Sequence, residues 1–104
     1  MSALQHSDET TFLNAWMQAG ACVLGVAAEA SVDISNLRIG LLDVAYVLKT
    51  GIVVRSDMLE DKGLWEVVGH SVDGLDLQVR LVISSADCNL KVLRVKKVSG
   101  RSKR

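Results

Sequence analysis

Proline is absent from this sequence of 104 residues, and cysteine and aromatic residues are scarce. The absence of proline, together with a hydrophobic content of 49%, excludes a disordered or low-complexity chain. The two cysteines, Cys22 and Cys88, are too few to form a zinc site by themselves, and no motif for a catalytic or metal centre occurs. We therefore expect no metal and no cofactor, and a chain that folds in a reducing compartment.

Lysine and arginine are missing from residues 1–37, although the whole chain has twelve basic and twelve acidic residues. Without a basic segment near its start the chain lacks the pattern of a secretory signal, so we expect a cytoplasmic protein. The length allows one domain, which we place at residues 1–98, followed by a tail at residues 99–104. After Asp87 there are seven basic residues and no acidic one. This basic end either contacts phosphate groups or forms a solvated tail.

A long stretch without charge dominates the first third of the chain. Between Glu9 and Glu29 lie 19 uncharged residues, which predict one helix from about Phe12 to Ala30. This length is close to that of a membrane span, but Asn14 and the absence of basic flanking residues argue against a span. We therefore expect no membrane partner.

A helix without a polar face must be covered on more than one side. A sheet covers one side, and we expect a second copy of the protein to cover another, because two-fold pairing is the commonest assembly of identical chains. The alternative is a helix at the centre of a compact monomer. The residues expected at the interface of the homodimer are Phe12, Trp16, Ala19, Gly20, Val23 and Leu24.

A second helix and a sheet are expected in the rest of the chain. We predict a turn over residues 31–36, a helix over residues 37–50 and a left-handed C-cap at Gly51. Asp73-Gly74 has the composition of a two-residue type I′ turn. The fold class is therefore α+β, with two N-terminal helices packed on one face of a four-stranded antiparallel meander. The strands are expected at residues 52–57, 64–72, 75–84 and 90–98.

The alternation of apolar and polar residues indicates which side chains face solvent. It is strict in the third strand, where Arg80 belongs to the polar set. The second strand permits two phases, with either Trp65 and Val67 or the residues on the opposite face in the core. We favour the first, which puts Glu66 and His70 on the open face with Arg80. In the fourth strand we expect Leu93 and Val95 in the core, and Arg94 and Lys96 beside Arg80.

Four segments of the chain resemble a known family. They are Arg38-Ile-Gly-Leu-Leu-Asp-Val-Ala-Tyr-Val-Leu-Lys-Thr-Gly51, Gly63-Leu-Trp-Glu-Val-Val-Gly69, Asp73-Gly-Leu-Asp-Leu-Gln-Val-Arg-Leu-Val-Ile83 and Leu90-Lys-Val-Leu-Arg-Val95. In this order they are similar to domain of unknown function family 4258, whose fold resembles that of the small RelE-like and BrnT-like toxins. The resemblance covers about residues 33–98. It implies a curved sheet backed by helices, with an open face that contacts RNA.

The resemblance also implies a chemistry, in which positioned side chains help the RNA 2′-hydroxyl attack the neighbouring phosphate. It makes His70 the candidate acid or base, and Arg80, Arg94 and Lys96 the candidate cations and nucleic-acid-binding residues. The zero net charge and the first helix without basic residues depart from such toxins. We therefore rank a non-catalytic, self-associating module that binds protein or RNA on the open face first. A metal-independent toxin-type RNA endonuclease is second, and a small-ligand-binding accessory domain is third.

Overall fold

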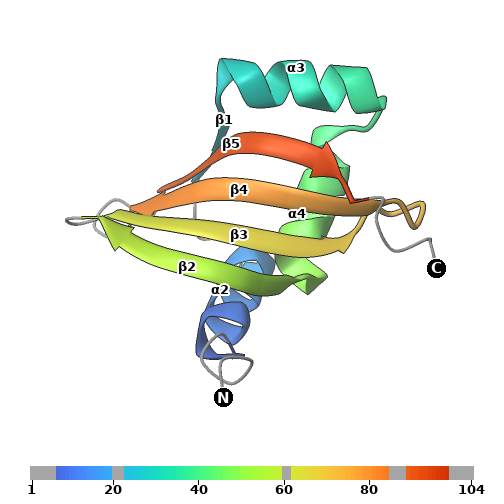
Figure 1. Ribbon diagram of the computed structural model, residues 1–104. Helices are drawn as coiled ribbons and strands as arrows, with labels where there is room; N and C mark the ends of the chain where they lie inside the picture. The colour runs from blue at the N-terminus through green and yellow to red at the C-terminus, as the bar shows by residue number, and fades with distance from the viewer. Residues whose placement is uncertain (1–6, 20–22, 60–61, 85–88, 99–104) are drawn as a thin grey trace.

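The computed structural model describes residues 7–19, 23–59, 62–84 and 89–98. Within these ranges three helices and five strands follow one another (Figure 1). The class is α+β, as predicted, but the chain forms more elements than expected. In chain order they are α2 (Ser7–Ala19), β1 (Val23–Val26), α3 (Ala28–Leu37), α4 (Leu41–Thr50), β2 (Ile52–Leu59), β3 (Lys62–His70), β4 (Asp76–Ser84) and β5 (Asn89–Lys97).

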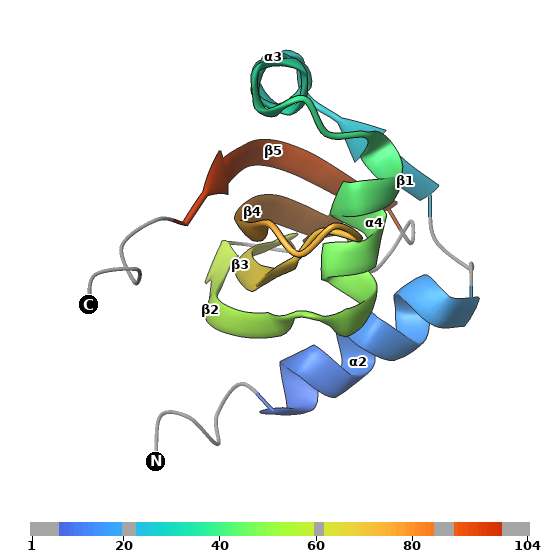
Figure 2. The same ribbon diagram turned by 90° about the vertical axis from the view of Figure 1, so that its right-hand side faces the viewer.

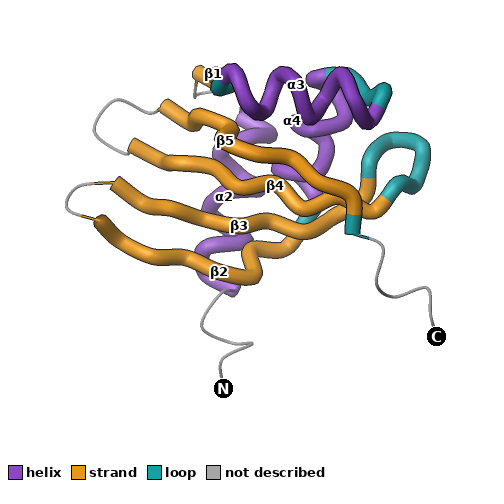
Figure 3. The backbone as a smooth tube through the Cα atoms, turned by 45° about the horizontal axis from the view of Figure 1, so that its top comes forward, coloured by secondary structure: helices purple, strands orange, loops and turns teal. Residues whose placement is uncertain are grey.

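The strands form one sheet in the order β1-β5-β4-β3-β2. β2 to β5 make the predicted antiparallel meander, and β1 adds a short parallel strand beside β5. Figure 2 shows α2 and α4 on one side of the sheet, with α3 above β5. Figure 3 shows the sheet from its other side, where β2 to β5 lie in front of these two helices. The face turned away from α2 and α4 is therefore the open face.

The prediction of one long helix from Phe12 to Ala30 is wrong, because this stretch is divided among α2, β1 and α3. The segment β1 is extended because its backbone pairs with β5, and the amide of Ala27 continues the pairing by donating to the carbonyl of Val92 at 2.8 Å. The expected turn at residues 31–36 lies inside α3. There Ala30, Ile34 and Leu37 recur at helical spacing and pack against the core.

The second predicted helix is shorter than expected and ends differently. Arg38, with a φ of 58°, is in the left-handed region and terminates α3, so α4 begins only at Leu41. Gly51 has a φ of −79° and is extended, so the left-handed C-cap predicted there is wrong. Glycine is needed for another reason, because a Cβ atom at this position would lie 2.5 Å from the carbonyl oxygen of Val47 and 2.7 Å from that of Val68.

The hairpin between β3 and β4 also differs from the predicted turn. Of Asp73 and Gly74 only the glycine has a positive φ, of 91°, whereas a type I′ turn requires two such residues. The amide of Gly74 donates to the carbonyl of Ser71, and the amide of Ser71 donates to the carbonyl of Leu75. These bonds enclose a three-residue loop, in which glycine supplies the one left-handed position.

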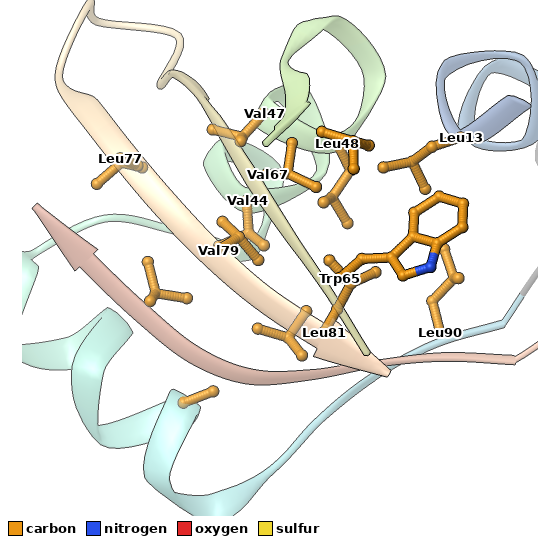
Figure 4. Packing of buried hydrophobic residues seen from close by; sticks show 14 of the residues in the cluster. Leu13, Val44, Val47, Leu48, Trp65, Val67, Leu77, Val79, Leu81 and Leu90 are labelled. Carbon is orange, nitrogen blue, oxygen red and sulfur yellow. The ribbon is translucent and has the colours of Figure 1, made fainter. Parts of the chain in front are cut away.

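The hydrophobic core lies between the sheet and the two helices on its covered face (Figure 4). The predicted phase of β3 is confirmed, because Trp65 and Val67 are buried. Val95 is buried as predicted, but Leu93 is only partly buried, and Val92 takes the core position instead. The helices contribute Leu13, Ala30, Val44, Val47 and Leu48, and β3 to β5 contribute Trp65, Val67, Leu77, Val79, Leu81, Ile83, Leu90, Val92 and Val95.

Candidate functional site

A row of charged side chains crosses the open face. Arg55 on β2 lies opposite Glu66 on β3, Glu66 lies opposite Arg80 on β4, and Arg80 lies opposite Arg94 on β5. Arg94 in turn binds Asp33 on α3. We call these five residues the charged row. Directly paired residues point to the same face of a sheet, so the four strand residues of the charged row lie together on the open face.

Glu66 holds the guanidinium group of Arg80. Nε and Nη2 of Arg80 donate to Oε2 of Glu66 at 3.2 and 2.8 Å, and Nε2 of Gln78 donates to Oε1 at 2.9 Å. The side chain of Glu66 is only 12% exposed, whereas that of Arg80 is 50% exposed. A nearly buried carboxylate thus fixes an arginine that still reaches solvent.

Asp33 holds Arg94 in the same way from the other side. Nε of Arg94 donates to Oδ2 at 2.8 Å and Nη2 donates to Oδ1 at 3.2 Å, while the backbone amide of Val95 donates to Oδ2 at 2.9 Å. The hydrogen bonds from Arg94 lower the pKa of Asp33; burial opposes this effect, and the amide of Val95 adds to it. The carboxylate raises the pKa of Arg94. Both groups are therefore charged at neutral pH.

The two arginines face each other between these carboxylates. Like charges directly opposite each other on neighbouring strands are destabilising. Along the charged row, the order of charges from Glu66 to Asp33 is negative, positive, positive, negative. Arg80 and Arg94 line a hollow of about 190 Å³ together with Gln78 and Lys96, which form the next cross-strand pair. Three of its four lining residues are basic; Arg80 and Arg94 are paired with carboxylates, and Lys96 makes no ion pair with a described residue.

A β-bulge brings one more cation to the open face. The pairing of β4 with β5 shifts between the Arg80–Arg94 pair and the Leu81–Val92 pair, which leaves Leu93 as the extra residue. Strict alternation would place Lys91 on the core face, but the bulge places it opposite Val82 on the open face. Lys91 is therefore absent from the predicted site residues. The sequence does contain a sign of the bulge. The apolar residues Leu90, Val92 and Val95 face the core together only if one extra residue lies between Val92 and Val95.

His70 lies apart from the arginines. Its Nδ1 atom is 2.6 Å from Oδ1 of Asp76, its partner on β4. Asp76 and Arg80 are four residues apart on β4, a separation of about 13 Å. His70 instead lines a different hollow, of about 310 Å³, with Thr50, Gly51, Ile52, Val68, Gly69, Asp76 and Val98. The structure thus brings Arg80, Arg94 and Lys96 together, as predicted, without His70.

The residues predicted to form a homodimer interface do not share one helix face. Phe12 and Trp16 remain together on α2, with ring centroids 4.2 Å apart, and Ala19 is the last residue of that helix. Val23 and Leu24 belong to β1. The expectation of one continuous apolar helix is therefore wrong. Gly20, both cysteines and the basic tail lie outside the described residues.

No protein-family model, curated protein or solved structure matches this chain. Within the described ranges, no three His, Cys, Asp or Glu residues are grouped so as to hold a metal ion. None of the helices in these ranges is long and apolar enough to cross a membrane. Function must therefore be inferred from the fold and from the geometry of the open face.

Proposed function

We propose that this protein is a non-catalytic binding module whose open sheet face binds an anionic group of a partner. The observation that supports this function most strongly is the opposed pair Arg80 and Arg94, each held by a carboxylate on its outer side. An anion between the two guanidinium groups relieves their mutual repulsion. Because Glu66 and Asp33 already fix the two side chains, less conformational entropy is lost when the anion binds.

The size of the hollow favours one group of a larger partner over a whole small molecule. Its volume of about 190 Å³ is below the range of about 300–1,000 Å³ that is typical of pockets for small-molecule ligands. The alternative of an accessory domain that binds a small ligand would instead use the hollow of about 310 Å³ beside His70, which is at the lower limit of this range.

A toxin-type RNA endonuclease is also less well supported. Such catalysis needs a base within hydrogen-bond reach of the attacking hydroxyl, and cations at the same phosphate. The distance of about 13 Å along the sheet between the rows of His70 and Arg80 does not provide this arrangement. Labelled RNA should stay intact when it is incubated with the protein. If the protein cleaves RNA, and Arg80→Ala and Arg94→Ala abolish the cleavage, the protein is a nuclease and not a non-catalytic binding module.

The binding function is tested by titrating the protein with inorganic phosphate and following backbone and arginine side-chain NMR signals. We expect the shifts to be concentrated at Gln78, Arg80, Arg94 and Lys96. Lys96→Gln and Arg80→Gln should weaken the response, whereas Lys49→Gln, which removes a charge from the exposed side of α4, should leave it unchanged. Shifts spread evenly over all lysines, or an unchanged response in Lys96→Gln, would contradict the proposed function.

We further propose that the module self-associates through its helical side. Phe12 is 43% exposed and its ring contacts that of Trp16 in α2 at an angle of 44°, and Leu42 in α4 is 82% exposed. α2 packs against α4, and both helices lie on the covered face of the sheet. Association on this side leaves the charged row accessible to a partner.

A further inference from the structure

A line of cations runs along β5 on the open face. It consists of Lys91, Arg94 and Lys96, which the bulge brings onto one side of the strand. Asp33 binds Arg94, whereas the side chains of Lys91 and Lys96 make no hydrogen bond or ion pair with any described residue. Both lysines are exposed. Two of the three cations on this line are therefore available to groups outside the molecule.

The spacing of these cations is that of an extended polypeptide. Arg94 and Lys96 are two residues apart on a strand, which separates them by about 7 Å. Side chains at alternate positions of an extended peptide have the same repeat of about 7 Å, so acidic residues at those positions lie opposite successive cations. We infer that the open face binds an extended peptide segment of a partner protein in which acidic residues alternate with uncharged ones. This inference rests on the proposed binding function and names its partner.

The aromatic residues argue for a peptide over a nucleic acid. Single-stranded nucleic acids gain much of their affinity from bases that stack on aromatic side chains. All four Phe, Tyr and Trp residues of the chain lie within the described ranges, and none is on the open face. Phe12 and Trp16 belong to α2, Tyr46 belongs to α4, and Trp65 is in the core.

The acidic residues near the cations argue in the same direction. Asp33 and Glu66 border the arginines, and Asp57 and Asp76 occupy other positions of the open face. Each of these carboxylates is paired with Arg55, His70, Arg80 or Arg94, so the open face has little excess of positive charge for a phosphate backbone with a charge at every nucleotide. A peptide in which acidic residues alternate with uncharged ones carries fewer charges, which suits the two lysines that have no partner among the described residues, and it places uncharged side chains opposite the ion pairs. Partly buried Val82, the partner of Lys91, offers such side chains an apolar contact.

Fluorescence anisotropy with four labelled probes tests this inference. The probes are a short peptide in which Glu alternates with Thr, its counterpart with Gln in place of Glu, a peptide with Glu at every third position, and a uridine hexanucleotide. We expect the alternating Glu peptide to bind most tightly. The Lys91→Ala, Lys96→Ala double variant should weaken its binding about tenfold, because two exposed charge pairs are lost. Lys49→Ala on α4 should not weaken it.

The inference is overturned if the hexanucleotide binds as tightly as the alternating peptide, if the Gln counterpart binds equally well, or if the double variant binds unchanged. Equal binding of the peptide with Glu at every third position would refute the extended register. Both lysines are exposed, so the double variant should keep its fold, which circular dichroism checks directly. If no peptide binds while inorganic phosphate still shifts the signals of Arg80 and Arg94, the partner class is wrong and the binding function stands.

Discussion

The carboxylate of Asp33 has two roles at the edge of the sheet. It fixes Arg94 in the charged row, and it accepts a hydrogen bond from the backbone amide of Val95. The strand β1 pairs with β5 only as far as Val92, so the rest of that edge lacks a neighbouring strand among the described residues. Exposed amides on an edge strand invite pairing with other chains. Asp33 thus covers the edge of β5 while it positions a cation of the candidate site.

Replacement of Asp33 should therefore give a stability difference that depends on pH. Hydrogen bonds from Arg94 and Val95 hold the pKa of Asp33 below its ordinary value. The ionised carboxylate thus stabilises the folded state above the unfolded-state pKa of about 3.9, and this contribution is lost as pH falls through the folded-state pKa. Asp33→Asn should lower the free energy of unfolding near neutral pH.

Urea denaturation of wild type and Asp33→Asn over a range of pH measures this effect. We expect a constant difference down to about pH 5 that narrows below about pH 4, as the wild-type carboxyl group becomes protonated. Asp73→Asn is the matched control, because Asp73 is exposed in the hairpin loop, and it should leave stability almost unchanged. A difference that is the same at every pH would show that the charge of Asp33 does not contribute.

Gly51 is required by close packing. An added Cβ atom would meet the carbonyl oxygens of Val47 and Val68 at 2.5 and 2.7 Å. Gly51→Ala should lower the free energy of unfolding by about 1–3 kcal/mol, the usual cost of overpacking. Gly25→Ala is the control, because the nearest atom to its Cβ would be the carbonyl oxygen of Leu90 at 3.8 Å. Gly25→Ala should leave stability unchanged or raise it by up to about 1 kcal/mol, since alanine restricts the unfolded chain. Thermal denaturation of Gly51→Ala and Gly25→Ala distinguishes the two effects.

At the scale of whole elements, polar side chains from the helices bind backbone groups of distant segments. Thr10 of α2 accepts a hydrogen bond from the amide of Val53 on β2. Asn14 of α2 donates to the carbonyl of Leu48 at the end of α4, and Asp43 of α4 accepts from the amide of Val72 in the hairpin loop. Each bond satisfies a backbone group that its own element leaves unpaired. These bonds add directional attachments to the hydrophobic contacts between helices and sheet.

The attachment of α2 to α4 is tested by Asn14→Ala. Nδ2 of Asn14 is 2.9 Å from the carbonyl oxygen of Leu48 and 3.4 Å from that of Gly51. Removal of the amide leaves partly buried carbonyl groups without this donor, so the free energy of unfolding should fall by about 1–2 kcal/mol. Gln18→Ala, at an exposed position of the same helix, should change it by less than about 0.5 kcal/mol. Equal effects of the two substitutions in urea denaturation would exclude the attachment.

The sequence predicts those elements whose pattern is local. The strict alternation through β4 correctly identifies Leu77, Val79 and Leu81 as core residues and Arg80 as exposed. The strand β1 is not predictable in this way, because Val23–Val26 is extended only through its pairing with β5, far along the chain. The bulge at Leu93 is another effect of pairing between strands. Alternation therefore brings Arg80, Arg94 and Lys96 together and places Glu66 on the same face. It omits Lys91, which the bulge moves, and Asp33, which belongs to α3.

The molecule as a whole presents two sides of different chemistry. The open face carries the charged row and the cations of β5, whereas the helical side exposes apolar residues at Phe12, Leu42 and Tyr46. Two copies joined through their helical sides would turn their open faces outward, so that each copy keeps a free binding surface. Bivalent presentation of two such faces would strengthen binding to a partner that has two acidic segments.

Self-association of the helical sides should depend on Phe12 and Trp16, the aromatic pair of α2. Phe12→Glu replaces the exposed ring of the aromatic pair with a carboxylate, which would be buried without a partner at the interface. In sedimentation velocity the variant should therefore shift from dimer to monomer at equal protein concentration. Val32→Glu is the matched control, since Val32 is 57% exposed on α3, and it should leave the dimer intact. A wild-type protein that sediments as a monomer at all concentrations, or a dimer that Phe12→Glu does not weaken, would exclude this interface.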